Sequence, residues 1–235
     1  MYISIKYCCI LLSVGMNEKL SDFTRLLYGI HYRTGHIKPV LPIEHVQNSS
    51  KLVLGTMLNS SYSIYTLMIE SPSIENLITC QKDLELESSL IISLVKELVQ
   101  RISPSSIFII TPHRIQRSTI QRKLSSTPFP NVSITCDTVE RMQGKEAQCV
   151  LICMLYRQRM TLEDELEFIY SRQRINVSIT RAQQLCILIT SDILLNRPPF
   201  RLFLNESTRN GFNLLTNYVS QSQLKILNEW GQSTT

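Results

Sequence analysis

The stretch RINVSITRA, residues 174–182, holds two arginines at a spacing that could serve chemistry. Its apolar residues fit both the two-residue period of a strand and the i, i+4, i+7 stripe of a helix. In a strand, Arg174 and Arg181 would point to opposite sides, whereas in a helix seven residues bring them to one face. A guanidinium group presents a planar fork of donors that matches phosphate oxygens. The spacing therefore raises the question of which anion the two side chains would bind.

Two further polar segments belong to the same half of the chain. TPHRIQR, residues 111–117, includes the end of an apolar run, and DTVERMQGKEAQ, residues 137–148, precedes another. These segments are among the most polar short stretches of the chain. Residues 113–117 are basic and are also compatible with a solvated face of a helix.

Apolar runs and one clear helical pattern must position these segments. The run at 106–112 ends at a proline, as a buried parallel strand does, and residues 83–101 combine an apolar face with early acids and late basic residues. Strands are predicted at 62–70, 106–112, 132–136, 148–156 and 185–190, helices at 83–101, 113–124 and around 211–228, and an irregular connection at 36–62. Strand and helix alternate, which predicts an α/β fold with a parallel sheet and helices on both faces.

In a sheet of this kind, the loops at the carboxyl ends of the strands form the functional edge. We therefore expect all three polar segments to gather at that edge.

Composition narrows the class of protein. The chain has 235 residues, 43% hydrophobic and 18% charged, so it is globular and long enough for its own core. Its net charge of +5 is compatible with a nucleic-acid partner without requiring one. Seven scattered cysteines include no CxxC pair, which predicts reduced thiols, a cytoplasmic or nuclear location and no metal site. Cys149 and Cys153 are expected in the core.

The first 14 residues, MYISIKYCCILLSV, allow two interpretations. One lysine followed by an apolar stretch resembles a weak signal peptide, and a buried strand at a domain edge is the alternative that we favour. The stretch is too short and too interrupted to span a membrane, and no other segment approaches that length. We expect no membrane partner.

Together, the three polar segments resemble the second RecA-like domain of superfamily 1 helicases, in the branch that includes the nonsense-mediated-decay helicase and the replication nuclease-helicase. IFIITPHRIQRSTI is similar to motif IV, DTVERMQGKEAQCVLI to motif V and RINVSITRAQ to motif VI, in the same order and spacing. The resemblance covers about residues 12–195. It implies a RecA-like, P-loop NTPase fold and makes 174–182 a helix, held by tertiary packing because β-branched residues are poor helix formers.

The resemblance also implies a role for each matched residue. Arg181 would be a catalytic arginine finger that stabilises charge on the transferring γ-phosphoryl group, and Arg174 a weaker ATP contact or a salt bridge that steadies the helix. In the motif V turn, Gly144 allows a bend and Glu146 would accept a hydrogen bond from a ribose hydroxyl. The expected ATP-binding residues are Gln143, Gly144, Glu146 and Arg174, and the expected nucleic-acid-binding residues are Thr111, Pro112, His113, Arg117 and Thr138.

Two positions depart from the family pattern. His113 stands where the family often has an aromatic ring, which could stack on a base. SVGMNEKLSDFTRLLY resembles another short family stretch, but Gly15 replaces an arginine that would be a second γ-phosphate contact. The chain thus lacks one contact that efficient ATP hydrolysis would use.

No G-x-x-x-x-G-K-[ST] stretch and no Asp-Glu pair after a strand is present to hold nucleotide phosphates and magnesium. In the family, both belong to the first RecA-like domain, and ATP binds between the two domains. We therefore expect the C-terminal half of an ATP-dependent RNA or DNA helicase, which uses ATP and Mg²⁺ only with a partner P-loop domain, upstream or in trans, and is inactive alone. The alternative is a non-enzymatic module that binds single-stranded nucleic acid or protein.

Three regions are expected along the chain. An edge segment covers 1–35, the RecA-like helicase C-terminal domain covers 36–200, and a C-terminal helical extension covers 201–235.

Overall fold

The computed structural model of the chain describes residues 16–28, 37–38, 42–43, 53–58, 62–70, 80–155, 167–196 and 205–228. The predictions for residues 1–14, for Gly15 and for most of 36–62 lie outside these ranges.

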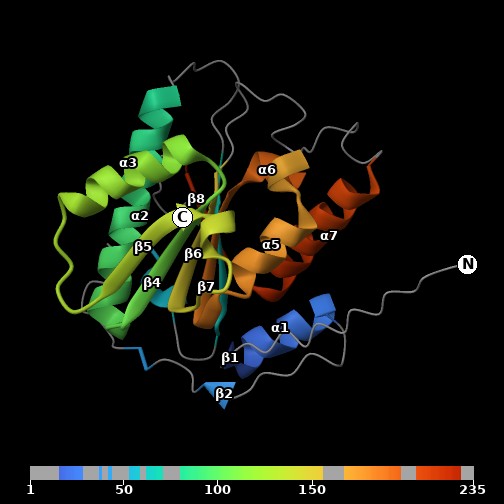
Figure 1. Cartoon of the computed structure of the whole chain (residues 1–235), viewed down its shortest axis with the longest axis horizontal. Helices are drawn as coiled ribbons and strands as arrows, with labels where there is room; N and C mark the ends of the chain where they lie inside the picture. Colours follow the sequence, from blue (N-terminus) through green and yellow to red (C-terminus); the bar gives the residue numbers. More distant parts are fainter. Residues whose placement is uncertain are drawn as a thin grey trace, which may run out of the picture.

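Six strands of the described part form one parallel sheet (Figure 1). In sheet order they are β5 (Ser133–Thr138), β4 (Ser106–Thr111), β6 (Ala147–Met154), β7 (Ala182–Ser191), β3 (Ile64–Ile69) and β8 (Gln223–Leu227). Every pair within this sheet is parallel. The predicted α/β class with a RecA-like parallel sheet is confirmed.

Helices cover both faces of the sheet. One face carries α2 (Cys80–Ile102) and α3 (Arg114–Ser125), and the other carries α1 (Glu18–Tyr28), α5 (Arg172–Ile179), α6 (Asp192–Asn196) and α7 (Glu206–Gln221). Short elements complete the described chain: the parallel pair β1 (Met16–Asn17) and β2 (Ile37–Lys38), and the 3-10 helices η2 (Gly55–Met57) and η3 (Val139–Met142). None of the described helices is long and apolar enough to cross a membrane.

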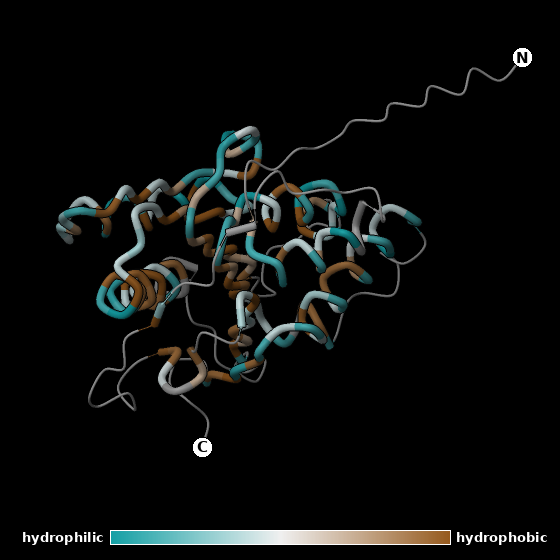
Figure 2. The backbone as a smooth tube through the Cα atoms, turned by 90° about the horizontal axis from the view of Figure 1, so that it is seen from below, coloured by the Kyte–Doolittle hydropathy of each residue, from teal (hydrophilic) through white to brown (hydrophobic). Residues whose placement is uncertain are grey.

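The two-sided cover explains why the strands are continuous apolar runs. Along β7, Cys186 and Leu188 belong to the core under α1, α5 and α7, whereas Leu185, Ile187 and Ile189 belong to the core under α2 and α3. Figure 2 shows the hydrophobic stretches running through the centre of the molecule. Cys149 and Cys153 are buried, as predicted.

The stretch RINVSITRA turns out to be helix and strand in succession. The helix α5 ends at Ile179, Thr180 caps it, and β7 begins at Ala182. Ile175 and Ile179 are each 1% exposed and pack into the core. The helix prediction is therefore confirmed for 174–179, and packing of its apolar stripe holds a segment of weak intrinsic propensity.

The C-terminal helix differs from the prediction around 211–228. It begins at Glu206, after Asn205 accepts a hydrogen bond from the Ser207 amide at 2.9 Å, and it ends at Gln221. The next residues form β8, which pairs with β3 in parallel. Pairing with a neighbouring strand overrides the local pattern there.

A buried ion pair fixes the segment 53–58 on α2. The Arg101 guanidinium lies 2.9 Å from the Glu97 carboxylate, with side chains 3% and 1% exposed. Arg101 also donates to the carbonyl oxygens of Gly55 and Leu58 at 2.6 and 2.8 Å, and Glu97 accepts from the Leu54 amide at 2.9 Å. Both charges are thus hydrogen-bonded, as buried charges must be.

Candidate functional site

Crossover connections divide the predicted site residues between two edges of the sheet. Parallel strands require connections that return from the carboxyl edge to the amino edge. Residues 139–146 make this passage between β5 and β6, and α5 makes it between β6 and β7. The carboxyl edge holds Thr111, Pro112, His113, Thr138 and Arg174, and the amino edge holds Gln143, Gly144, Glu146 and Arg181.

The prediction that all three polar segments gather at the carboxyl edge is therefore wrong for the amino-edge residues. A segment that precedes a parallel strand ends at the amino edge of that strand, so motifs V and VI each cross from one edge to the other. Arg174 lies roughly 7.5 Å of helix rise before the end of α5 at Ile179, and Arg181 lies beyond that end.

The two crossovers are tied together near both ends. At one end, Arg174 Nε donates to Glu140 Oε1 at 2.8 Å. At the other end, Arg181 Nη1 donates to the Lys145 carbonyl oxygen at 3.1 Å, and the Ala147 amide donates to the Arg181 carbonyl oxygen at 3.0 Å. Motifs V and VI therefore form one connected unit that spans the sheet from edge to edge.

At the amino edge, the partly exposed Arg181 side chain folds back over the end of α5. Its Nε donates to the Val177 carbonyl oxygen at 2.9 Å and its Nη2 to Thr180 Oγ1 at 3.0 Å. A cation is favourable at this position because it faces the negative end of the helix dipole. The guanidinium is beside the motif V turn, since its third partner is the residue before Glu146.

The motif V turn has the geometry that its glycine permits. Gly144 has φ of 78°, a left-handed conformation that L side chains rarely adopt, and Gln143 next to it is exposed. Glu146 Oε2 accepts a hydrogen bond from Gln183 Nε2 at 3.1 Å. Gln183 was not among the predicted residues, although its place two residues after the motif VI arginine was a usable signal.

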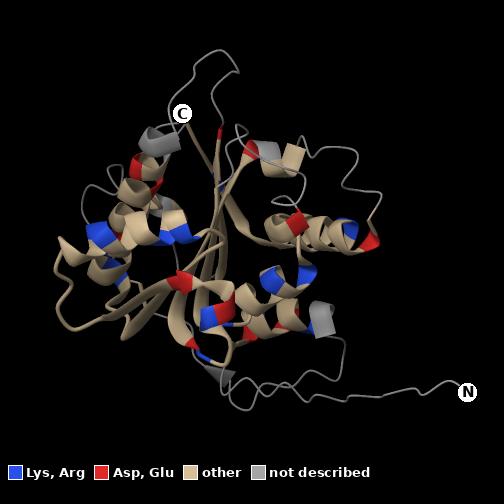
Figure 3. Cartoon of the chain, turned by 45° about the horizontal axis from the view of Figure 1, so that its top comes forward, with Lys and Arg blue, Asp and Glu red and all other residues tan. Residues whose placement is uncertain are grey.

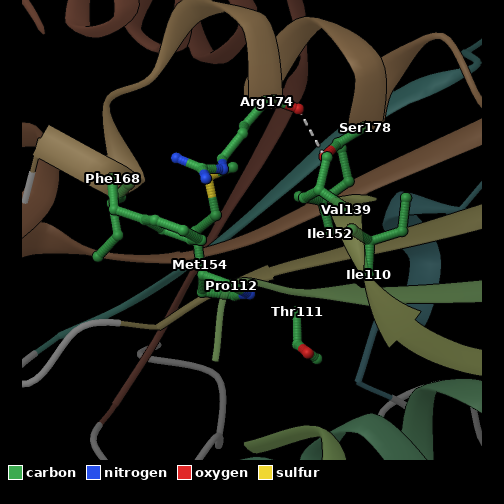
Figure 4. A pocket seen from close by; sticks show the side chains of 10 residues that line it. Ile110, Thr111, Pro112, Val139, Ile152, Met154, Phe168, Arg174 and Ser178 are labelled. Atoms are coloured by element: carbon green, nitrogen blue, oxygen red, sulfur yellow. Dashed lines mark hydrogen bonds between the residues drawn. The ribbon is translucent and has the colours of Figure 1, made fainter. Parts of the chain in front are cut away.

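At the carboxyl edge, Arg174 lines a narrow, largely apolar pocket (Figure 4). Its guanidinium carbon lies 3.4 Å from the centroid of the Phe168 ring. Partial burial opposes ionisation of Glu140, but the hydrogen bond and positive charge of Arg174 outweigh it and hold the pKa of Glu140 below its usual value. Arg174 is thus fixed by an aromatic ring and a carboxylate that come from different segments.

His113 joins the same group of side chains. Its ring stacks on Phe168 with centroids 6.2 Å apart and an interplanar angle of 21°. Thr111 is fully buried, and its hydroxyl lies 3.4 Å from the His113 carbonyl oxygen. Phe168 was missed by the sequence interpretation, although an aromatic residue six positions before Arg174 could have indicated it.

Three of the four basic side chains on α3 form ion pairs with nearby acids. Arg117 pairs with Asp137 at 2.9 Å, and both Arg122 and Lys123 pair with Glu85. Burial raises the pKa of Asp137, but hydrogen bonds from the Thr138 amide and Arg117 more than offset this and leave that pKa lowered. Figure 3 accordingly shows basic and acidic residues intermixed over α3 and its surroundings. Arg117 is therefore held in an ion pair and does not lie on a solvated basic face. The salt-bridge alternative stated for Arg174 agrees with its bond to Glu140.

Gly211 on α7 positions the start of α5. A Cβ at this residue would lie 1.5 Å from the Tyr170 carbonyl oxygen and 3.1 Å from the Arg172 amide nitrogen. Helix and turn therefore touch backbone to backbone, just ahead of Arg174.

Replacing Gly211 with alanine should lower the free energy of unfolding by about 3 kcal/mol, because neither backbone can move away without disturbing the core. Chemical unfolding monitored by circular dichroism measures this change. The matched control is Asn213→Ala on the exposed face of α7, which should shift stability by about 0.5 kcal/mol at most. A Gly211→Ala protein as stable as that control would show that the contact is not tight.

Comparison with known proteins gives consistent results. The model of a family described as AAA domain matches residues 16–192. The DNA replication ATP-dependent helicase/nuclease JHS1 of Arabidopsis thaliana is 28% identical over 55% of this chain and 9% of its own length. The probable helicase senataxin of Mus musculus is 33% identical over 40% of this chain and 3% of its own length. The chain thus spans less than a tenth of either relative.

A solved structure, the C-terminal domain of a possible DNA helicase from Lactobacillus plantarum WCFS1, aligns with 76% of this chain and 88% of its own at 11% identity and a TM-score of 0.38. The family model covers well over half of the chain and includes all three motif-bearing segments, and both relatives are described as helicases. The chain therefore belongs to the AAA domain family and is a C-terminal RecA-like domain of the superfamily 1 helicases, in the branch of the nuclease-helicases and the nonsense-mediated-decay helicase.

Proposed function

We propose that this chain works as the second RecA-like domain of an ATP-dependent helicase on single-stranded RNA or DNA. In this proposal, the amino edge of the sheet meets the nucleotide and the carboxyl edge meets the nucleic acid. The observation that carries it is the division of the motif residues between two edges, joined by two crossovers that are bonded to each other near both ends. A displacement at one edge would then move the other.

At the amino edge, Arg181 would supply the arginine finger and Glu146 would accept a hydrogen bond from the ribose. ATP suits this edge because a partly exposed guanidinium and a carboxylate adjoin one turn. Magnesium does not suit it, because no group of three or more His, Cys, Asp or Glu side chains within the described ranges could hold a metal ion. The P-loop and the metal ligands would come from a first RecA-like domain, upstream or in trans.

At the carboxyl edge, Pro112, His113 and Thr138 would contact the nucleic-acid backbone or bases. Arg174 lies with them and away from the other ATP-binding candidates, so we assign it to the nucleic acid. Arg117 would act through its ion pair with Asp137, and the buried Thr111 would shape the loop.

A non-enzymatic nucleic-acid-binding module is the second candidate. Two observations favour it. Each of the three nitrogens of the Arg181 guanidinium donates a hydrogen bond to a neighbouring residue of the same chain. Gly15 stands where the family pattern has an arginine. Such a module would bind single strands with an affinity that falls steeply as salt rises.

One reconstitution separates the two candidates. The purified 235-residue chain should hydrolyse no ATP, whereas the same chain fused behind the P-loop domain of a superfamily 1 helicase should hydrolyse ATP faster when single-stranded nucleic acid is added. Phosphate release assays measure both. ATP hydrolysis by the chain alone would contradict the proposal that the P-loop must come from another domain. Nucleic-acid binding without ATPase activity in the fusion would favour the non-enzymatic module.

A further inference from the structure

The guanidinium of Arg174 is held as a fixed plane. Phe168 supports it from a distance of 3.4 Å, and Glu140 accepts its Nε–H at 2.8 Å. Arg174 comes from α5, Phe168 from the helical residues 167–169 ahead of α5, and Glu140 from η3. A long side chain that is already ordered loses little further conformational entropy when it receives a ligand.

The surroundings of this plane suit a flat, partly apolar ligand. The floor of the pocket is apolar and includes Val139, Ile152 and Met154, and the Arg174 side chain crosses above Met154 in Figure 4. Arg174 remains 33% exposed, so solvent reaches the group. Among the described residues, no hydrogen-bond partner of its two terminal nitrogens is found.

We propose that the Arg174 guanidinium, supported by Phe168, is a stacking platform for one unpaired nucleobase. This inference rests on the proposed nucleic-acid role of the carboxyl edge. Unpaired bases of single strands stack on arginine planes and on aromatic rings, and this stacking does not depend on which base is present. The His113 ring, 6.2 Å from the Phe168 ring and nearly parallel to it, extends the stacked group. The platform therefore selects single strands over duplexes without reading sequence.

An abasic-site scan tests this platform. A fluorescent single-stranded oligonucleotide, shortened to the minimal length that still binds so that only one register is available, has its bases removed one position at a time. Its binding to the 235-residue chain is followed by fluorescence anisotropy. The wild-type chain should show one position at which loss of the base weakens binding about tenfold. In Phe168→Leu and in Arg174→Lys, the intact oligonucleotide should bind more weakly and the penalty at that position should nearly vanish.

Arg174→Lys separates stacking from simple charge, since lysine keeps the positive charge but loses the plane. Phe129→Leu is the matched control, because Phe129 packs against the core on the α2 and α3 side of the sheet. It should leave the abasic profile unchanged. Thermal unfolding of each variant shows whether it is folded, and Arg174→Lys carries the test if Phe168→Leu is unstable.

The outcomes are distinguishable. The platform would be wrong if no position in the wild-type profile were sensitive to base removal. It would also be wrong if Arg174→Lys kept the wild-type affinity and profile, and Arg174 would then be interpreted as a contact to phosphate. Failure of the wild-type chain to bind any single strand would instead overturn the proposed function itself.

Discussion

Replacing Arg181 with alanine should lower the ATPase rate of the reconstituted two-domain enzyme by roughly 10³-fold. A guanidinium beside the motif V turn would otherwise stabilise the negative charge that builds up on the transferring phosphoryl group. Steady-state phosphate release at saturating ATP and saturating single-stranded nucleic acid measures the loss. Nucleic-acid affinity should change little, because the residue lies at the opposite edge from the carboxyl-edge contacts.

Two variants frame this result. Arg181→Lys keeps the charge without the planar fork and should recover only a small part of the rate, whereas Arg209→Ala, on the exposed side of α7, should leave it unchanged. Since Arg181 also bonds to the end of α5, the thermal midpoint of each variant must be measured beside the rate. An alanine variant that keeps at least half of the wild-type rate would show that the finger assignment is wrong.

Replacing Arg101 with methionine should lower the free energy of unfolding by about 3–5 kcal/mol. The change leaves the Glu97 carboxylate buried without its partner and removes the donors that hold the carbonyl oxygens of Gly55 and Leu58. Urea unfolding followed by circular dichroism gives the difference. A loss of this size is a large share of the stability of a typical domain.

The double variant Glu97→Leu/Arg101→Met is the informative control. It removes both charges, so much of the lost stability should return. The exposed pair Arg25–Asp22, with side chains 49% and 61% exposed, offers a second comparison, and Asp22→Ala should cost less than about 1 kcal/mol. If Arg101→Met were no more harmful than Asp22→Ala, the buried network would not be stabilising the segment 53–58.

The fold was predictable wherever local pattern and burial agree. Strands β4, β6 and β7 are apolar on both faces because helices cover both faces of the sheet. Such strands appear in the sequence as continuous apolar runs, which made them predictable. Helix α2 was equally predictable from the sequence, because Leu84, Ile91 and Val95 repeat at helical spacing and are all buried. β8 was not, because a short strand at the sheet edge has no distinctive period and is specified by its pairing with β3.

The candidate site was predictable as a set of residues but not as an arrangement. Motif spacing indicated Arg181 and Glu146, yet only the crossover path shows that they share the amino edge. The partners Asp137 for Arg117 and Phe168 for Arg174 depend on strand register and on packing between distant segments. Such contacts leave no periodic trace in the chain.

The position of β3 has a consequence for how the protein is made. This strand comes early in the chain, yet both of its neighbours, β7 and β8, come from the last third. Thr66 Oγ1 lies 2.6 Å from Ser222 Oγ although the two residues are 156 positions apart. During synthesis, the apolar strand β3 therefore stays unpaired at both hydrogen-bonding edges until β7 and β8 have also left the ribosome. Closure over such separations is slow, and the waiting strand is the part of the nascent chain most exposed to mispairing.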